Sequence, residues 1–364
     1  MLKAATATRQ PRQGAARFDV EIAGVATAVP AHKVSQADIA ERAKAVFPHL
    51  ARHEALYANT GISDRYFCQA ADWYCEHHGW EERTEIFQRH ALSLLEQVTL
   101  ASVAAAGISL DDIGALVVNT ITGLAIPSLD AKLMNRLKLP ASVARLPIFG
   151  LGCGGGVAGL ARAARFAQAM PGGHVLFPTV DLCSLCLRVA DPSMAMFVSA
   201  ALFGDGAAGI VLRNTAGSNG AGGRGRIIAV GDHFWPNTEH IMGWDIKQDG
   251  FGVVLSPELP ALLRKELVPA LRGFLEANSL SLGEFSGFLL HPGGAKILKT
   301  VQELLGLSDD DLALSAGVLR DFGNMSSPTA LFTLDRAVQS GASGPHLLVA
   351  FGPGFSAYFV AVEL

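Results

Sequence analysis

The chain has 364 residues, of which 50% are hydrophobic and 17% are charged, and its formal net charge is −4 at pH 7. This length and composition are typical of a globular protein that buries a large core, as one large domain or two fused ones. The 29 Lys and Arg residues are scattered along the chain, which argues against nucleic acid or an anionic membrane as a partner.

The amino-terminal segment, residues 1–17, has no apolar run of about 7 to 15 residues, as a signal peptide would. We expect a flexible tail there. No later stretch reaches the roughly 18 unbroken apolar residues of a membrane span. The five cysteines are spread out, unlike the disulfide framework of a small secreted domain. The sequence therefore predicts a cytoplasmic protein with free thiols.

Strands and helices alternate along the first part of the chain. Apolar runs predict strands over residues 19–27, 115–120 and 174–184. Helical periodicity predicts helices over residues 35–46, 84–106, 128–137 and 157–170. Ser35 is the expected N-cap of the first helix. The alternation is typical of an α/β fold with buried sheets.

A glycine-rich stretch, residues 214–225, separates these elements from a second series. Strands are predicted over residues 227–230, 285–290, 346–351 and 357–362. Helices are predicted over residues 258–278, 295–305 and 329–340. Because the order of elements repeats, we expect a duplicated α/β unit with halves over residues 18–213 and 226–364.

Cys153 lies at the centre of a glycine-rich run, residues 150–156, directly before a predicted helix. Free backbone N–H groups and the positive end of a helix dipole at such a junction favour a thiolate, the nucleophilic form. We therefore expect an enzyme with an activated cysteine. The run also matches a dinucleotide-binding fingerprint, so an NAD-dependent oxidoreductase is an alternative. Against it, Asp181 follows about 30 residues later, whereas the fingerprint places its acid about 20 residues on.

Two positions in the second half point to chemistry. His291 follows the predicted strand over residues 285–290 and precedes Pro-Gly-Gly, which places an imidazole at the carboxyl end of a strand, where α/β sites commonly lie. Asn324 precedes the predicted helix over residues 329–340. Its side chain is expected either to cap that helix or to donate to a developing oxyanion.

A metal-binding module is another alternative. Its ligands would be Cys183 and Cys186, or the group Cys68, Cys75, His77 and His78. No second C-x-x-C pair exists in the sequence, and Cys183 and Cys186 lie in an apolar run. Buried thiols therefore fit that run better than zinc ligands.

With Cys153, His291 and Asn324 in this order, the sequence resembles the type III polyketide synthases, the chalcone synthase family of the thiolase-like fold. The resemblance runs from about Phe18 to Leu364. The matching segments, in the family's order, are residues 152–153, 201–208, 290–294, 323–328 and 351–355. The resemblance implies a layered αβαβα fold from two similar halves and a homodimer. It implies coenzyme A thioesters as substrates, with no metal or other cofactor.

The resemblance also implies a mechanism, that of a decarboxylating acyltransferase. Cys153, as a thiolate paired with protonated His291, takes an acyl group from an acyl-coenzyme A starter. His291 and Asn324 then donate hydrogen bonds to malonyl-coenzyme A, so that loss of carbon dioxide leaves a stabilised enolate. The enolate attacks the Cys153 thioester, and the cycle repeats before ring closure to an aromatic or pyrone product.

Further positions match the family's substrate contacts. Phe203 matches the gatekeeper phenylalanine between the coenzyme A tunnel and the cavity. Residues that match cavity positions are Cys183, Cys186, Gly243 and Ser326, with Gly352 in the Gly-Pro-Gly turn. Ile126 stands where the family inserts a side chain into the partner's cavity. The family places three basic residues near the coenzyme A phosphates. Of these positions, only that of Arg52 is basic here, and Ala55 and Asn59 stand at the other two.

Departures from the plant pattern bear on the substrate. Gly154 stands where plant members carry a bulky aromatic, and residues 241–256 look like bacterial members that make alkylresorcinols or alkylpyrones from fatty acyl starters. Gly154 and Ala125 are expected to help open a long apolar tunnel for such a chain. Two alternatives stay open: a malonyl-coenzyme A-only synthase that forms a naphthalene or phloroglucinol, and a 3-oxoacyl carrier protein synthase of the same fold. The latter has His-Gln-Ala-Asn where this chain has His-Pro-Gly-Gly.

Overall fold

The computed structural model describes residues 18–216 and 222–364. The tail predicted over residues 1–17, and residues 217–221 of the glycine-rich joint, lie outside the described residues. Within the described ranges, no helix has the length and apolar character needed to cross a bilayer.

The first half of the chain contributes five strands to the main sheet. They are β1 (Val20–Ala28), β4 (Ile113–Asn119), β5 (Ala144–Ile148), β6 (His174–Leu182) and β7 (Asp205–Asn214). Their order is β5-β4-β6-β7-β1, with β4 parallel to β5 and β6, and β7 antiparallel to β6 and β1. The inner strands β4, β6 and β7 are buried along nearly their whole length, as expected where helices cover both faces of a sheet.

The second half repeats this arrangement. Its strands are β8 (Gly225–Phe234), β11 (Gly287–Leu290), β12 (Pro345–Gly352) and β13 (Ser356–Glu363). Their order β11-β12-β13-β8 has the same directions as β4-β6-β7-β1. Strands β1 and β8 meet through two residue pairs and join both halves into one sheet. The prediction of a fold built from two similar α/β halves is confirmed.

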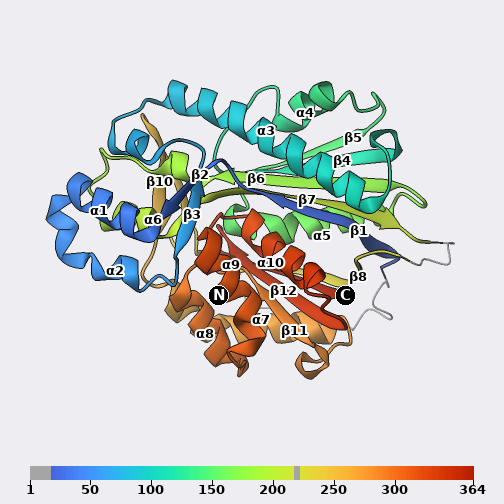
Figure 1. Cartoon of the computed structure of the whole chain (residues 1–364). Coiled ribbons are helices and arrows are strands. Elements are labelled where there is room, and N and C mark those ends of the chain that lie inside the picture. Colours follow the sequence, from blue (N-terminus) through green and yellow to red (C-terminus); the bar gives the residue numbers. More distant parts are fainter. Residues whose placement is uncertain (1–17, 217–221) are drawn as a thin grey trace, which may run out of the picture.

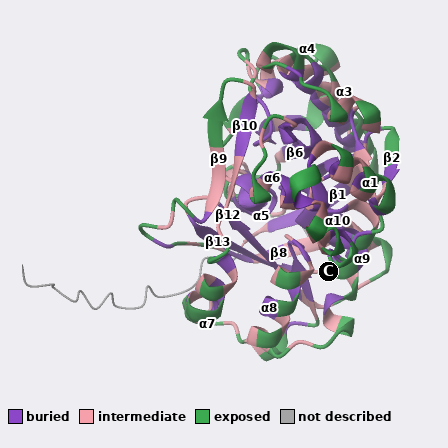
Figure 2. Cartoon of the chain, turned by 90° about the vertical axis from the view of Figure 1, so that its left-hand side faces the viewer, coloured by how far each residue is buried: buried purple, intermediate pink, exposed green. Residues whose placement is uncertain are grey.

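The helices form three layers around the two halves of this sheet (Figure 1). The central layer is α5 (Gly155–Gln168) packed on α10 (Pro328–Gln339). One outer layer is α3 (Trp80–Ala106) with α4 (Leu129–Leu137), and the other is α7 (Leu259–Ala277) with α8 (Ala295–Leu305). Figure 2 shows the buried residues concentrated in the sheet and the exposed residues on the outer helices. The result is the expected αβαβα layering.

Smaller elements complete the molecule at one end of the sheet. The helices are α1 (Gln36–Val46), α2 (Ala55–Ala58), α6 (Met194–Leu202) and α9 (Ala313–Phe322). The strand pairs are β2 (His32–Ser35) with β3 (Asp64–Phe67), and β9 (Met242–Lys247) with β10 (Gly250–Leu255). Ser35 caps α1 as predicted, since its Oγ accepts from the Asp38 N–H at 3.1 Å. Helix α6 is apolar almost all round, so its sequence carries no amphipathic period that would have predicted it.

Candidate active site

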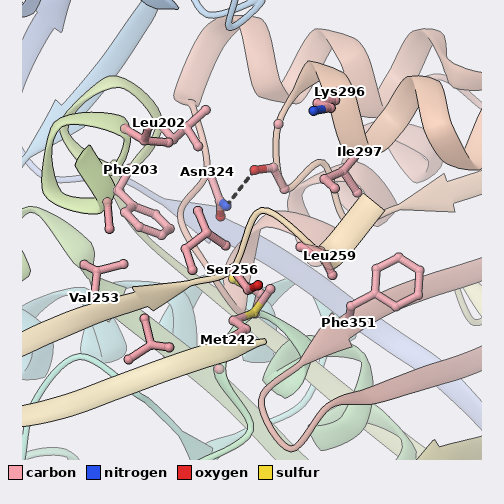
Figure 3. Close-up of a pocket in the computed structure, with 18 of the residues that line it drawn as sticks. Leu202, Phe203, Met242, Val253, Ser256, Leu259, Lys296, Ile297, Asn324 and Phe351 are labelled. Carbon is pink, nitrogen blue, oxygen red and sulfur yellow. Dashed lines mark hydrogen bonds between the residues drawn. The ribbon is translucent and has the colours of Figure 1, made fainter. Parts of the chain in front are cut away.

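A cavity of about 720 Å³ brings the three predicted catalytic residues together. Cys153 comes from the short 3-10 helix η4 (Gly152–Gly154) that leads into α5, His291 follows β11, and Asn324 precedes α10. Both halves of the fold therefore contribute to one site. Phe203, Gly243 and Ser326, which the resemblance assigns to the substrate, also line this cavity, and Figure 3 shows the side chains around Asn324.

Glycines let the backbone that carries Cys153 lie against the turn over residues 352–354. A Cβ on Gly152, whose φ is +51°, would lie 2.5 Å from Pro353 Cδ. A Cβ on Gly154 would lie 2.4 Å from Cε2 of the Tyr358 ring, and one on Gly352 would lie 2.3 Å from the Leu151 carbonyl oxygen. Larger residues would push Cys153 away from the rest of the site.

This packing overturns one prediction about the tunnel. Gly154 faces the Tyr358 ring, and neither Gly154 nor Ala125 is among the residues that line the cavity. They therefore do not open it. Gly352 also lies outside the lining, between Phe351 and Pro353, which do line it. Its contribution is the close approach to Leu151 rather than contact with the cavity.

Burial determines the protonation states of Cys153 and His291. Their exposed fractions are only 9% and 4%. Burial raises the pKa of Cys153 to about 11, although a hydrogen bond with the Ser326 side chain opposes the rise. Burial also lowers the pKa of His291 to about 4. Burial therefore disfavours the charged form of each group in the ligand-free site, which opposes the expected resting pair of thiolate and protonated imidazole. Loss of water around the sulfur outweighs the helix dipole.

The His291 side chain is buried without a hydrogen bond. Neither ring nitrogen has a partner among the described residues. The backbone is fixed, because the His291 N–H donates to the Val349 carbonyl oxygen at 2.8 Å. Buried polar atoms are rarely left unpaired, and an exception calls for an explanation. Here the ring is free to take or donate a proton inside the cavity.

The Asn324 amide is oriented by two hydrogen bonds. Its Oδ1 accepts from the Ser326 N–H at 2.8 Å, so Nδ2 is the donor end. Nδ2 donates to the Gly293 carbonyl oxygen at 3.2 Å, a long bond that is drawn as the dashed line in Figure 3. Gly293 and Asn324 both line the cavity, so this donor is available to a substrate oxygen.

Phe203 and Asn324 are joined by a short parallel bridge. The Gly204 N–H donates to the Asn324 carbonyl oxygen at 3.0 Å, and the Asn324 N–H donates to that of Leu202 at 2.9 Å. The fully buried Arg65 stabilises the same segment, because its Nη1 donates to the Ala200 and Phe203 carbonyl oxygens at 2.6 and 2.9 Å. The aromatic ring and the amide are thus held on one rigid backbone unit.

A buried carboxylate fixes the loop between Asn324 and α10. Asp181 Oδ2 accepts from the Ser327 Oγ and N–H at 2.5 and 3.0 Å, and Oδ1 accepts from the Ile121 N–H at 2.8 Å. Burial raises the pKa of Asp181. Ser326, the residue before Ser327, has a φ of +59°. The network holds this unusual conformation beside the nucleophile.

Two walls of the cavity extend beyond the predicted residues. The β9–β10 hairpin adds Trp244 and Val253 to the predicted Gly243, and α6 adds Met194. Arg188 anchors the tip of the hairpin, because its Nε donates to Asp249 Oδ1 at 2.8 Å. Lys296 in α8 also lines the cavity and was missed. The feature of the sequence that could have indicated this role is the position of Lys296 only five residues after His291.

Besides Gly352, four other predicted substrate contacts lie outside this cavity. Cys183 and Cys186 are 0% and 1% exposed in the 3-10 helix η5 (Cys183–Cys186), where burial raises the pKa of each thiol. Arg52 is exposed, and its Nε donates to the neighbouring His53 ring at 3.1 Å. Ile126 is 98% exposed. Across residues 18–216 and 222–364, no three His, Cys, Asp or Glu side chains gather as a metal site would require.

Comparisons with known proteins agree with this arrangement. The sequence matches the family of chalcone and stilbene synthases, with the N-terminal domain over residues 7–216 and the C-terminal domain over residues 226–362. It is 36% identical to 1,3,6,8-tetrahydroxynaphthalene synthase of Streptomyces peucetius, over 94% of this chain and 92% of that protein. It is 32% identical to phloroglucinol synthase of Pseudomonas fluorescens, over 92% of this chain and 96% of that protein.

A solved structure has the same fold. The crystal structure of 1,3,6,8-tetrahydroxynaphthalene synthase from Streptomyces coelicolor, a bacterial type III polyketide synthase, superimposes with a TM-score of 0.88. It covers 94% of this chain and 99% of its own, at 28% identity. The likeness thus extends over both halves of the chain.

Proposed function

Since this chain belongs to the chalcone and stilbene synthase family, the type III polyketide synthases, and is therefore an acyltransferase, we propose that it extends an apolar acyl starter with malonyl units on Cys153. The observation that carries the proposal is the unpartnered His291 ring in the same cavity as Cys153 and the Asn324 amide. The required groups are a nucleophile, a base and an oxyanion donor, and no metal or redox cofactor is needed.

The first step is loading of the starter. His291 takes the proton of the Cys153 thiol as the sulfur attacks the thioester carbonyl of the acyl-coenzyme A. The carbon–sulfur bond to coenzyme A breaks, and its thiolate leaves with the proton from His291. The raised pKa of Cys153 and the lowered pKa of His291 suit this transfer, because they favour an unprotonated base before the substrate arrives.

The second step is decarboxylative condensation. Malonyl-coenzyme A places its thioester oxygen near Asn324 Nδ2 and the His291 ring, so that loss of carbon dioxide leaves an enolate that both groups stabilise. The enolate carbon attacks the Cys153 thioester, and the bond between that carbonyl carbon and the sulfur breaks. Phe203 on the wall of the cavity keeps water away from the enolate.

The lining of the cavity supports an apolar starter such as a fatty acyl group. Apolar side chains form most of its walls, among them leucine, valine, methionine and tryptophan side chains from α6 and the β9–β10 hairpin. Burying an alkyl chain against such walls is favourable by about 25 cal/mol per Å² of apolar surface. A second function, synthesis from malonyl-coenzyme A alone, is favoured by the similarity to the tetrahydroxynaphthalene and phloroglucinol synthases.

Incubation with malonyl-coenzyme A, alone and with a series of fatty acyl starters, tests the two functions. Mass spectrometry of the products should reveal alkylated resorcinols or pyrones that are absent from Cys153→Ala. Cys75→Ala is the matched control, since Cys75 is exposed and outside the cavity. Product from malonyl-coenzyme A alone, unchanged by added starters, would instead support the second function. No condensation under any condition would exclude both.

We further propose that the protein is a homodimer in which Ile126 contacts the partner. Strand β5 is an edge strand with an almost wholly exposed face, and such edges pair readily with another strand. Exposed apolar side chains accompany it, namely Leu124, Ile126, Leu146 and Phe149. Light scattering should give the mass of two chains for the native protein and of one chain for Leu146→Asp. Ile246→Asp, at an exposed apolar residue on the β9–β10 hairpin, is the control that should stay dimeric.

A further inference from the structure

The cavity changes from buried to exposed along its length. Cys153, His291 and Asn324 at one end are all less than 10% exposed. The lining residues that are exposed at the surface are Asn59, Met194, Pro257 and Lys296. These four, from four different segments, form the mouth of the cavity. A substrate that reaches Cys153 must pass between them, and any part too large or too polar to enter stays beside them.

Lys296 is the one residue with a formal charge in the lining. No Arg, Asp, Glu or other Lys among the described residues contributes to that surface. Lys296 lies in the first turn of α8 (Figure 3), and it takes part in none of the ion pairs among the described residues. An unpaired ammonium at the mouth of an otherwise uncharged cavity is positioned for an anion.

The substrate class of the proposed function supplies that anion. A coenzyme A thioester carries its reactive carbonyl at one end of a long pantetheine arm and its phosphate groups at the other. The arm is nearly neutral and fits the apolar cavity, whereas the phosphates are too strongly hydrated to enter it. They must remain at the mouth. Asn59 there is uncharged, and Arg52 is outside the lining, so neither takes the place of Lys296.

We infer that Lys296 binds the phosphate groups of the coenzyme A thioester and makes the enzyme prefer coenzyme A esters over short thioesters. This inference rests on the proposed function, because it names the residue that recognises the substrate of the same site. A lysine ammonium is a compact donor that pairs with phosphate oxygens from several directions.

Kinetics of Lys296→Met with two thioesters test the inference. This change removes the charge and keeps a long side chain. With malonyl-coenzyme A we expect KM to rise about fivefold with kcat unchanged, as for the loss of an exposed ion pair. With malonyl-N-acetylcysteamine, which has no phosphate, KM should not change. Lys299→Met, at an exposed lysine in the same helix that does not line the cavity, is the control and should behave as the native enzyme.

Binding and salt dependence give readouts that do not require turnover. By calorimetry, free coenzyme A should bind Lys296→Met about fivefold more weakly than the native protein, and raising the salt concentration should weaken only the native protein's binding. An unchanged Kd and KM in the variant would overturn the inference. So would equal rises in KM for both thioesters, since these would indicate a damaged site. Failure of the native enzyme to condense any thioester would refute the proposed function, while coenzyme A binding would still decide the role of Lys296.

Discussion

The two central helices each begin beside a residue of the site, but the two junctions are built differently. Cys153 precedes α5 and is placed by glycines, which let η4 and α5 approach other backbone segments closely. Asn324 precedes α10 and is placed by hydrogen bonds through Asp181, Ser326 and Ser327. The Cys153 junction depends on glycines, which have no side chain, and the Asn324 junction depends on polar side chains. Substitutions should therefore disrupt the Cys153 junction by steric clash and the Asn324 junction by loss of hydrogen-bond partners.

The largest effect is expected where the two junctions meet. A Cβ on Gly156 would lie 2.0 Å from the Ser327 carbonyl oxygen, so neither segment can stay in place. Gly156→Ala should lower the free energy of unfolding by about 3 kcal/mol and remove most condensation activity. Urea unfolding and product formation measure both effects. Gly273→Ala, in α7 with no atom within 4 Å of the added Cβ, should be as stable as the native protein or slightly more so. Equal stability of the two variants would contradict the steric account.

The second prediction concerns the buried thiol between the junctions. With a pKa of about 11, Cys153 should react with iodoacetamide about tenfold faster for each unit of pH between 7 and 10. The sign follows from the raised pKa, because only the thiolate reacts and its fraction grows until the pH reaches that value. Mass spectrometry of the peptide containing residue 153 gives the rate. A rate that is already constant above pH 7 would mean that a thiolate–imidazolium pair is present at rest.

The third prediction tests the polar junction alone. Ser327→Ala removes the donor 2.5 Å from Asp181 Oδ2 and leaves a buried carboxylate with fewer partners. The cost should be about 1–3 kcal/mol of stability, with a rise in the mobility of Asn324 and a fall in kcat. Ser340→Ala, at the exposed end of α10, is the matched control and should cost less than about 1 kcal/mol. Normal kcat in Ser327→Ala would show that the loop needs no such support.

The smallest effect is expected at a glycine that is not part of either junction. Gly243 lines the cavity, and a Cβ there would have no atom within 4 Å. Gly243→Ala should change stability by less than about 1 kcal/mol. Because the methyl group points into open space, it should still shift the length of the products, which mass spectrometry can resolve. A loss of stability as large as that of Gly156→Ala would contradict the distinction between packing glycines and cavity glycines.

The sequence predicted the parts of the site that depend on local pattern and order. Cys153, His291 and Asn324 stand beside predicted strand ends or helix starts, and the repeated order of elements predicted the two halves. The raised pKa of Cys153 could not be predicted, because the helix start is visible in the sequence but the burial is not. The apolar side chains of α6 and the β9–β10 hairpin that line the cavity were missed for a similar reason. Their apolar residues carry no period that separates a cavity wall from core.

The bridge between Phe203 and Asn324 limits how the cavity admits its substrate. Because hydrogen bonds tie the backbone on both sides of Phe203 to Asn324, the aromatic residue cannot swing aside as part of a moving loop without displacing the amide. Passage must come from rotation about the side-chain torsions of Phe203 alone. Such rotations take on the order of nanoseconds, whereas loop rearrangements extend to roughly microseconds. Entry past this ring is therefore a fast local event, and the oxyanion donor stays in position while it occurs.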